Sequence, residues 1–429
     1  MQEMLLSDMP RLILLTTIAV FFSISSLYAA GFPSSNLTEA GRTTILKHEN
    51  QTILLIEKDR KTDQPPGIVL ELSGFGTLLL ESGTETEILE FSVGDIKESI
   101  SIYEGTTGIF PEKIIISGSF DLFSAGVFQA TDSSVPMPAD IGHIIFSDFS
   151  LKRNPEWELY SWNLLPEVII FDTADYSVQA RLFKRLAFFV EKPGFTGTLV
   201  SDKNLENRHG WNAHDYKADD LAAFFSKAEA ENFQLNSEEL MLKDILLERG
   251  IITESTEGGT SPYQEGKGVV LSVSRETLPS WRYRFLTHEC LHSIFFTNKT
   301  YREDIGNVIA ALAPAEIEYW KRLLDYRRYD VTNEYLFVNE ITSYSLQQPM
   351  DETDDYFKGF MSRRMVAARS YEKEFVDNFL RTRPSSFTQT ASALGDVLRA
   401  YTGRGPGHLA NLYPADLPSS FFNLFPPAK

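Results

Sequence analysis

Two histidines and a glutamate in residues 287–293 have types and a spacing that could do chemistry. The segment reads Thr-His-Glu-Cys-Leu-His-Ser, so His288 and His292 are four residues apart. On a helix, residues four apart lie on one face, and both imidazoles can bind the same metal ion. Glu289 lies about 100° further round, where its carboxylate can reach a water molecule held by that ion. Two zinc ligands and a general base are the core of metal-assisted amide hydrolysis.

The flanking sequence favours a helix that is buried on several sides. Pro279 is a suitable first-turn residue, and the strand-like residues 269–273 lie just upstream. Large apolar side chains surround the motif: Trp281, Phe285, Leu286, Phe295 and Phe296. A chance match to this motif is expected in roughly one protein in a hundred. The alternative interpretation is therefore a buried helix whose histidines only satisfy local hydrogen bonds.

A catalytic zinc ion usually has three protein ligands and one open position for water, so a third ligand is expected. Glu340 is the best downstream candidate, because it shares a predicted helix face with the apolar Phe337, Ile341 and Tyr344. A carboxylate on a buried face is costly unless it is paired or bound to metal. We therefore expect Glu340 to complete a zinc site with His288 and His292.

The helix that carries Glu340 is expected to start at a cap residue, Asp330 or Thr332, and to end before Pro349. Glu334 is the alternative third ligand. It falls in the first turn of this helix, where the helix dipole alone explains an acidic residue, so Glu340 is preferred.

The H-E-x-x-H segment followed by an Asn-Glu helix resembles the zincin metallopeptidases of the gluzincin branch. Residues 339–343, Asn-Glu-Ile-Thr-Ser, are similar to the Asn-Glu-x-x-Ser segment of the thermolysin-like enzymes. The resemblance implies His288, His292 and Glu340 as zinc ligands and Glu289 as the general base. The chain differs in two respects: Glu340 lies 48 residues after His292, a longer gap, and Tyr344 stands where that pattern has an aspartate. The third histidine of the metzincin pattern is absent.

The charge and the cysteine content of the chain argue against several classes of binding partner and against a disulfide. The chain has 429 residues, enough for two domains, and a net charge of −19, which argues against nucleic acid or an anionic membrane surface as a partner. Cys290 is the only cysteine, so the chain folds without an intrachain disulfide. It lies about 200° from His288 on the helix and is expected in the core as a small apolar residue.

Residues 1–30 are predicted to be an export signal. An apolar run, residues 12–27, precedes a small-residue cleavage region at residues 28–31. Acidic residues before this run are unusual, and Met9 is an alternative start. The expected location is periplasmic or secreted, in a bacterium. An uncleaved membrane anchor is the alternative, and only then is contact with a membrane expected.

Residues 31–150 are predicted to form a β-rich domain of the sandwich or barrel type. Short β segments at residues 52–56, 68–72, 77–80, 87–91 and 113–116 are separated by Gly, Pro and Asp. We expect a β-sandwich-like domain that serves as scaffold or binds carbohydrate or protein.

Residues 151–429 are predicted to form an α-rich, zincin-like catalytic domain, so the overall class is α+β. A buried strand is expected at residues 167–172 and a further strand at residues 194–200. Helices are expected at residues 178–190, 216–229, 237–249, 305–312 and 315–329, and from beyond Pro349 to about residue 381.

Other polar side chains could assist catalysis. Residues 208–216 contain His209, Trp211 and His214, which could line a cleft, whereas Asp215 is explained as the cap of the next helix. A zinc peptidase also needs a donor for the oxyanion, and Tyr344, His408 and His214 are the candidates.

The sequence predicts an exported zinc metallopeptidase that hydrolyses peptide or protein substrates, with Glu289 as the base. The alternative is an envelope or adhesin-type binding protein whose zinc site is structural or vestigial. A fourth protein ligand from His209, His214 or His408 would favour that alternative. The oligomeric state is not indicated.

Overall fold

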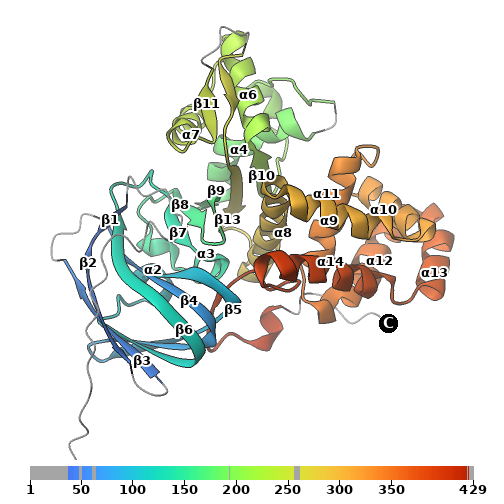
Figure 1. Cartoon of the computed structure of the whole chain (residues 1–429). Coiled ribbons are helices and arrows are strands. Elements are labelled where there is room, and N and C mark those ends of the chain that lie inside the picture. The colour runs from blue at the N-terminus through green and yellow to red at the C-terminus, as the bar shows by residue number, and fades with distance from the viewer. Residues whose placement is uncertain are drawn as a thin grey trace, which may run out of the picture.

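The computed structural model describes residues 37–47, 51–59, 64–192, 194–255, 261–422 and 424. The expected export signal, residues 1–30, lies outside these residues. Within the described chain, no helix combines the length and the apolar character needed to cross a membrane. Helices and strands both contribute extensively, which confirms the predicted mixture of α and β structure (Figure 1).

The first sheet has seven strands in the order β14-β5-β4-β6-β3-β2, and β1 pairs with β6. The strands are β1 (Leu37–Glu39), β2 (Gly41–Lys47), β3 (Gln51–Lys58), β4 (Gly67–Ser82), β5 (Glu85–Tyr103), β6 (Lys113–Ala130) and β14 (Leu412–Pro414). Their pairs are antiparallel, and alternating apolar residues such as Leu70, Leu80 and Ile116 form a common core. A sandwich would need two packed sheets, whereas these strands belong to one bent sheet (Figure 1).

The segments 68–72 and 77–80, predicted as separate strands, are parts of the single strand β4. Gly74 lies at a bulge with φ of +95°, where the register with β5 shifts. At Gly76, a Cβ atom would lie 2.0 Å from the carbonyl oxygen of Ser117 on the neighbouring strand. These glycines therefore bend a continuous strand and allow close backbone approach, instead of ending the strand.

The second sheet has five strands in the order β10-β13-β9-β8-β7. They are β7 (Met137–Ala139), β8 (Trp157–Trp162), β9 (Leu165–Thr173), β10 (Ala213–Lys217) and β13 (Val269–Ser274). Strand β13 is parallel to β9 and antiparallel to the edge strand β10. Alternate residues of β9 enter different cores: Ile170 packs with the helix α8 (Pro279–Thr297), and Ile169 packs with α4 (Tyr176–Val190). The sheet thus lies between two helical layers.

The layer that includes α4 follows the sequence prediction closely. It contains α5 (Asp202–Leu205), α6 (Ala218–Ala230) and α7 (Ser237–Glu248), with a small hairpin of β11 (Ile252–Glu254) and β12 (Tyr263–Glu265). Asn236 and Glu239 form a capping box at the start of α7. Two expectations were wrong. Residues 194–200 form turns rather than a strand, and Asp215 lies inside β10, because the cap position of α6 is Lys217.

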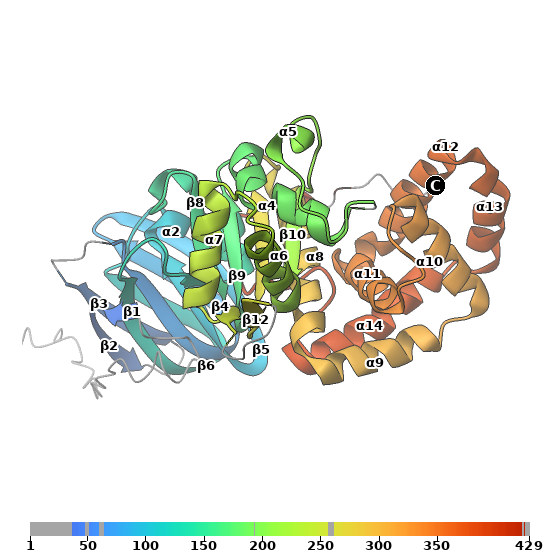
Figure 2. The same cartoon turned by 90° about the horizontal axis from the view of Figure 1, so that it is seen from above.

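The C-terminal part of the chain is helical as predicted up to about residue 381, and a further helix at residues 386–402 was not predicted. Its helices are α9 (Lys299–Ala310), α10 (Pro314–Tyr326), α11 (Glu334–Leu346), the π-helix η4 (Asp355–Met361), α12 (Ser362–Ala368), α13 (Lys373–Thr382) and α14 (Ser386–Thr402). Figure 2 shows the first sheet and these helices at opposite ends, with the second sheet between them. Asn333 caps α11, in place of the expected Asp330 or Thr332, because its side chain accepts from the backbone N–H of Leu336.

Strand pairing crosses residue 150 in both directions. Strand β7 precedes this position but belongs to the second sheet, and β14 returns from the C-terminal part to the first sheet. Asp140, the N-cap of α3 (Ile141–Phe146), accepts hydrogen bonds from the backbone N–H groups of Asn411 and Leu412. Buried Arg404 pairs with Glu98 of β5. These contacts join the C-terminal segment to the first sheet.

Candidate metal centre

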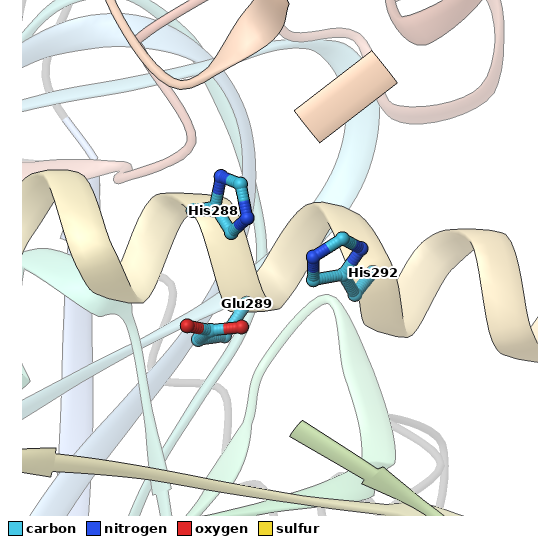
Figure 3. Close-up of side chains that lie close together, drawn as sticks. All are labelled: His288, Glu289 and His292. Carbon is cyan, nitrogen blue, oxygen red and sulfur yellow. The ribbon is translucent and has the colours of Figure 1, made fainter. Parts of the chain in front are cut away.

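The helix α8 carries the H-E-x-x-H segment. Pro279 occupies its first position, and the helix runs for 19 residues between the second sheet and α11. His288, Glu289 and His292 are buried, and one ligand atom from each lies within 4.8 Å of the others. Figure 3 shows the Glu289 carboxylate on a different side of the helix from the His288 ring. The helix therefore presents the imidazoles and the carboxylate to different neighbours.

A buried ion cluster holds the start of α8 against the second sheet. Asp172 at the end of β9 accepts hydrogen bonds from Arg282 of α8 at 2.8 Å and from Arg275 at 2.6 Å. Burial alone would raise the pKa of Asp172, but Arg282, Lys152 and Arg275 together lower it below its usual range. The ionised carboxylate thus anchors the helix that carries the candidate ligands.

Glu340 on α11 faces both imidazoles, as the sequence predicts. Its Oε2 lies 3.6 Å from Nε2 of His288, and its Oε1 lies 3.5 Å from Nε2 of His292. Glu340 is 5% exposed, and its Oε2 has no hydrogen-bond partner within the described structure. The structure therefore brings together three side chains that lie on two helices and are 48 residues apart in sequence.

The separations between Glu340 and the two imidazoles fit a zinc ion. Zinc binds imidazole nitrogen at about 2.0–2.1 Å and carboxylate oxygen at about 2.0–2.2 Å, so two ligand atoms of a tetrahedral site are about 3.3–3.5 Å apart. The separations of 3.5 and 3.6 Å between Glu340 and the two Nε2 atoms are close to this value. An unpartnered buried carboxylate oxygen is costly in free energy, and a bound cation removes that cost.

The second nitrogen of each imidazole is held by α11. Nδ1 of His288 donates to Oε1 of Gln347 at 2.9 Å, and Nδ1 of His292 lies 3.0 Å from Oγ of Ser343. With Nδ1 protonated, the lone pair of His288 is on Nε2, the atom that faces Glu340. Such partners orient metal-binding histidines. Both partners follow Glu340 on its own helix, three and seven residues later, a spacing that could have revealed them.

Both imidazoles are neutral at physiological pH. Burial lowers the pKa of His288 to about 4, against an opposing effect of the hydrogen bond to Gln347. Burial also lowers the pKa of His292 to about 4, although the nearby carboxylate of Glu340 acts to raise it. Neutral imidazole is the form that binds metal, so neither ligand has to lose a proton first.

Glu289 lies among carboxyl groups that sequence reasoning did not assign to the site. Its side chain hydrogen-bonds with Asp215 of the edge strand β10. Burial, and then the charges of Glu340 and Glu191, raise the pKa of Glu289 well above its usual range. Glu191 follows α4, lies beside Trp211, and has a pKa raised by burial to about 8. We call Glu191, Asp215 and Glu289 the acidic side of the site.

The candidate metal site opens into a cleft of about 450 Å³. The acidic side lines part of it, and Trp281, Phe285, Tyr356 and Phe360 line another part. Of the three candidate oxyanion donors, Tyr344 lines the cleft. Its ring packs edge-on against His288, with centroids 4.8 Å apart, and its hydroxyl accepts a hydrogen bond from Nε of Arg327 at 3.1 Å. Tyr344 is therefore beside a candidate zinc ligand.

The other two donor candidates lie elsewhere. His214 alternates with Asp215 along β10, so it points into the opposite core, where Nδ1 lies 2.9 Å from Oγ of Ser272. His408 packs against Phe422 and is not among the residues that line the cleft. From the same segment as His214, His209 and Trp211 do line the cleft. Residues 208–216 therefore line part of the cleft, but their buried histidine, His214, points away from it.

The remaining predictions about single residues concern Cys290 and Glu334. Cys290 is fully buried in the core beneath α8, as expected for a small apolar residue. Glu334 is exposed at the first position of α11 and is not among the residues that line the cleft. Between the two candidate third ligands, the geometry therefore favours Glu340.

Comparison of the chain with protein-family models, with curated proteins and with solved structures finds no match. The argument for function therefore depends on the geometry of the site itself.

Proposed function

We propose that the protein is a zinc-dependent metallopeptidase, with His288, His292 and Glu340 as zinc ligands and Glu289 as the general base. One observation carries this proposal: Glu340, from a different helix, faces the Nε2 atoms of both histidines at 3.5–3.6 Å. The periodicity of either helix alone does not require Glu340 to lie near the two histidines. Hydrogen bonds to Nδ1 of each histidine support the same assignment.

Bound zinc would supply a water molecule of lowered pKa and polarise the scissile carbonyl group. Glu289 is placed to accept a proton from the attacking water and to return it to the leaving amine. Asp215 orients the Glu289 carboxylate through their hydrogen bond. The Tyr344 hydroxyl, held by Arg327, is placed to donate a hydrogen bond to the developing oxyanion.

The edge strand β10 supports a peptide as the substrate. Among the described strands it pairs with β13 alone, and its residues Ala213 and Asp215 line the cleft. An extended peptide can add to such an edge through main-chain hydrogen bonds, which position the scissile bond without requiring a particular sequence. In this proposal, residues 151–429 form the zincin-like unit, the N-terminal sheet acts as its scaffold, and residues 1–30 direct export.

The alternative, a binding protein with a structural or vestigial zinc site, requires a fourth protein ligand. Of the three histidines considered for that position, His209 lines the cleft, and its Nε2 lies 3.0 Å from Oδ1 of Asn212. His214 and His408 are not among the lining residues. The cleft beside Glu340 therefore favours an open site.

Elemental analysis of the purified protein tests the proposal. One zinc ion per chain is expected in the parent and in Glu289→Gln, and loss of zinc in His288→Ala, His292→Ala and Glu340→Ala. Glu334→Ala is the matched control, because it removes an exposed glutamate from the same helix. The parent is then expected to hydrolyse a mixed peptide library, whereas the four site variants are expected to be inactive.

Failure of the parent to bind zinc after reconstitution would rule out the proposed enzyme. Zinc bound without hydrolysis of any peptide, and with a fourth protein ligand detected by X-ray absorption spectroscopy, would favour the binding-protein alternative.

A further inference from the structure

The lining of the cleft also includes arginines that form no salt bridge with a carboxylate among the described residues. The protein has a net charge of −19, so its cations have many possible partners. Arg327 and Arg364, which both line the cleft, form no salt bridge within 4 Å among the described residues, although Arg327 is close enough to Glu340 to act to lower the pKa of that carboxyl group. Arg284, in the same wall, differs because it donates to Glu352 at 2.6 Å. We call Arg327 and Arg364 the arginine side of the cleft.

Arg364 packs against a group of aromatic rings. It lies on α12 with its guanidinium carbon 5.1 Å from the ring centroid of Phe360. The Phe360 ring stacks on Tyr356 at 6.1 Å and lies 6.4 Å from that of Trp281. An arginine over an aromatic face keeps its N–H donors available for a planar acceptor. The exposed guanidinium is therefore held beside the cleft and can still bind a ligand.

Arg327 extends the positive charge toward the candidate metal ligands. Its Nε donates to the Tyr344 hydroxyl at 3.1 Å, and the Tyr344 ring packs against His288. Because this hydrogen bond uses Nε, the terminal N–H groups are available for a second acceptor. The positive charge therefore extends from the wall at Arg364 to the neighbourhood of the candidate zinc site.

We propose that the arginine side binds a carboxylate of the substrate, so that the enzyme prefers acidic peptides. This inference rests on the proposed peptidase function and specifies its substrate class. Guanidinium binds a carboxylate in a bidentate, planar arrangement that neither an amide nor an ammonium group can reproduce. The carboxylate has two possible sources, a Glu or Asp side chain and the C-terminus of the peptide, and these can be separated experimentally.

The test uses the full-length, zinc-loaded protein and matched peptides. Each peptide is made with Glu, Gln or Lys at one position and with a free or amidated C-terminus. Their affinities are measured by calorimetry on Glu289→Gln, which binds without turnover, and their kcat/KM values are measured on the parent. For one or more positions, Glu is expected to be favoured over Gln by about tenfold, the value of one charge-assisted contact of about 1.4 kcal/mol.

The variants Arg364→Gln and Arg364→Glu identify the residue responsible. Arg364→Gln should reduce the preference for Glu to about twofold or less, and Arg364→Glu should favour Lys over Glu. Arg363→Gln is the matched control, because it removes the neighbouring exposed arginine of α12, which is not among the residues that line the cleft. It should keep the parental preference. A tenfold preference for free over amidated C-termini, equally lost in Arg364→Gln, would identify the C-terminus as the source.

Equal affinity for Glu, Gln and Lys peptides with either C-terminus would overturn the proposal, as would a preference that persists in Arg364→Gln and Arg364→Glu. Hydrolysis of all these peptides without preference would overturn it and leave the peptidase function intact. Conversely, binding of acidic peptides that is lost in Arg364→Gln, with no hydrolysis of any peptide, would support the carboxylate site and refute the peptidase function.

Discussion

The two sides of the cleft have opposite charge and are built by different parts of the chain. The acidic side comes from α4, β10 and α8, and its three carboxyl groups have raised pKa values, chiefly because they are buried together. The arginine side comes from α12 and the segment after α10, and its guanidinium groups form no salt bridge within 4 Å among the described residues. The candidate metal ligands line the same cleft.

In the proposed peptidase, this difference would separate two tasks of amide hydrolysis. Removing a proton from water requires a general base, and burial among like charges makes the carboxyl groups of the acidic side better proton acceptors. Negative charge that develops on the scissile carbonyl, or that belongs to the substrate, is stabilised by the donors of the opposite side. Changes on the acidic side should therefore reduce kcat, whereas changes on the arginine side should also alter substrate preference.

The largest expected effect is from Glu289→Gln. The amide keeps the size of the side chain but cannot accept the proton, so kcat should fall by about 10³-fold with KM nearly unchanged. Steady-state kinetics on the best peptide from the library checks this, with the zinc content as control. A variant that retains zinc and more than a tenth of the parental kcat would place the general base elsewhere.

Tyr344→Phe should give the next largest effect. Loss of the hydroxyl removes a hydrogen bond that forms only as charge develops, so kcat should fall by about 10²-fold without a change in KM. Tyr335→Phe is the matched control, because it removes an exposed tyrosine hydroxyl from the same helix, and Tyr335 is not among the residues that line the cleft. If the control loses as much activity as Tyr344→Phe, the assignment of a single donor is wrong.

Asp215→Asn should lower kcat by about tenfold, because Asp215 acts through Glu289 and does not touch the substrate. The asparagine can still donate a hydrogen bond to Glu289, but it removes the ionisable carboxyl group beside the base. The readout is kcat against KM together with the zinc content, which should be unchanged. Loss of zinc from this variant would mean that Asp215 supports the metal ligands and not the base.

Glu191→Gln should change stability more than it changes activity. Burial raises the pKa of Glu191 from 4.5 to about 8, so the folded chain keeps a proton that the unfolded chain has lost. This contribution to the free energy of unfolding is fully present below pH 4.5 and disappears as the pH rises through about 8. Glutamine does not ionise. Above pH 8, the free energy of unfolding of the variant should therefore exceed that of the parent by about 1–2 kcal/mol.

Urea denaturation of the metal-free proteins at pH 5, 7 and 9 measures this difference, which should widen with pH. The exposed Glu206→Gln provides the control and should show no such widening. A difference that narrows as the pH rises would mean that Glu191 is ionised and stabilised in the fold.

Local sequence patterns predicted much of the structure around the site. The spacing of His288 and His292 places both imidazoles on one face of a helix, and Pro279 begins that helix. The position of Glu340 on an otherwise apolar stripe indicated a carboxylate with a buried partner. These inferences depend on helical periodicity and on the cost of burying charge, both of which can be read from a single segment.

Other features had no local signal. Asp215 looked like a helix cap, and it became a neighbour of Glu289 only because β10 pairs antiparallel with β13 at the edge of the second sheet. Gly74 and Gly76 looked like turn residues, although the neighbouring strands continue past them. A glycine can serve a turn, a bulge or a close approach of two backbones, and only the pairing partners distinguish these uses.

The sequence by itself therefore determined the helix with two imidazoles and its adjacent carboxylate, because these residues lie within about one turn of one another. It also indicated that Glu340 is a carboxylate on an apolar stripe, but only the packing of α11 against α8 brings Glu340 to the two imidazoles. Only the tertiary structure decided which carboxyl groups gather around Glu289, which tyrosine lies beside His288, and which arginines lack carboxylate partners. Those contacts join segments more than 50 residues apart along the chain, for example Asp215 and Glu289. Their chemistry follows from the packing of strands and helices, which no short segment encodes.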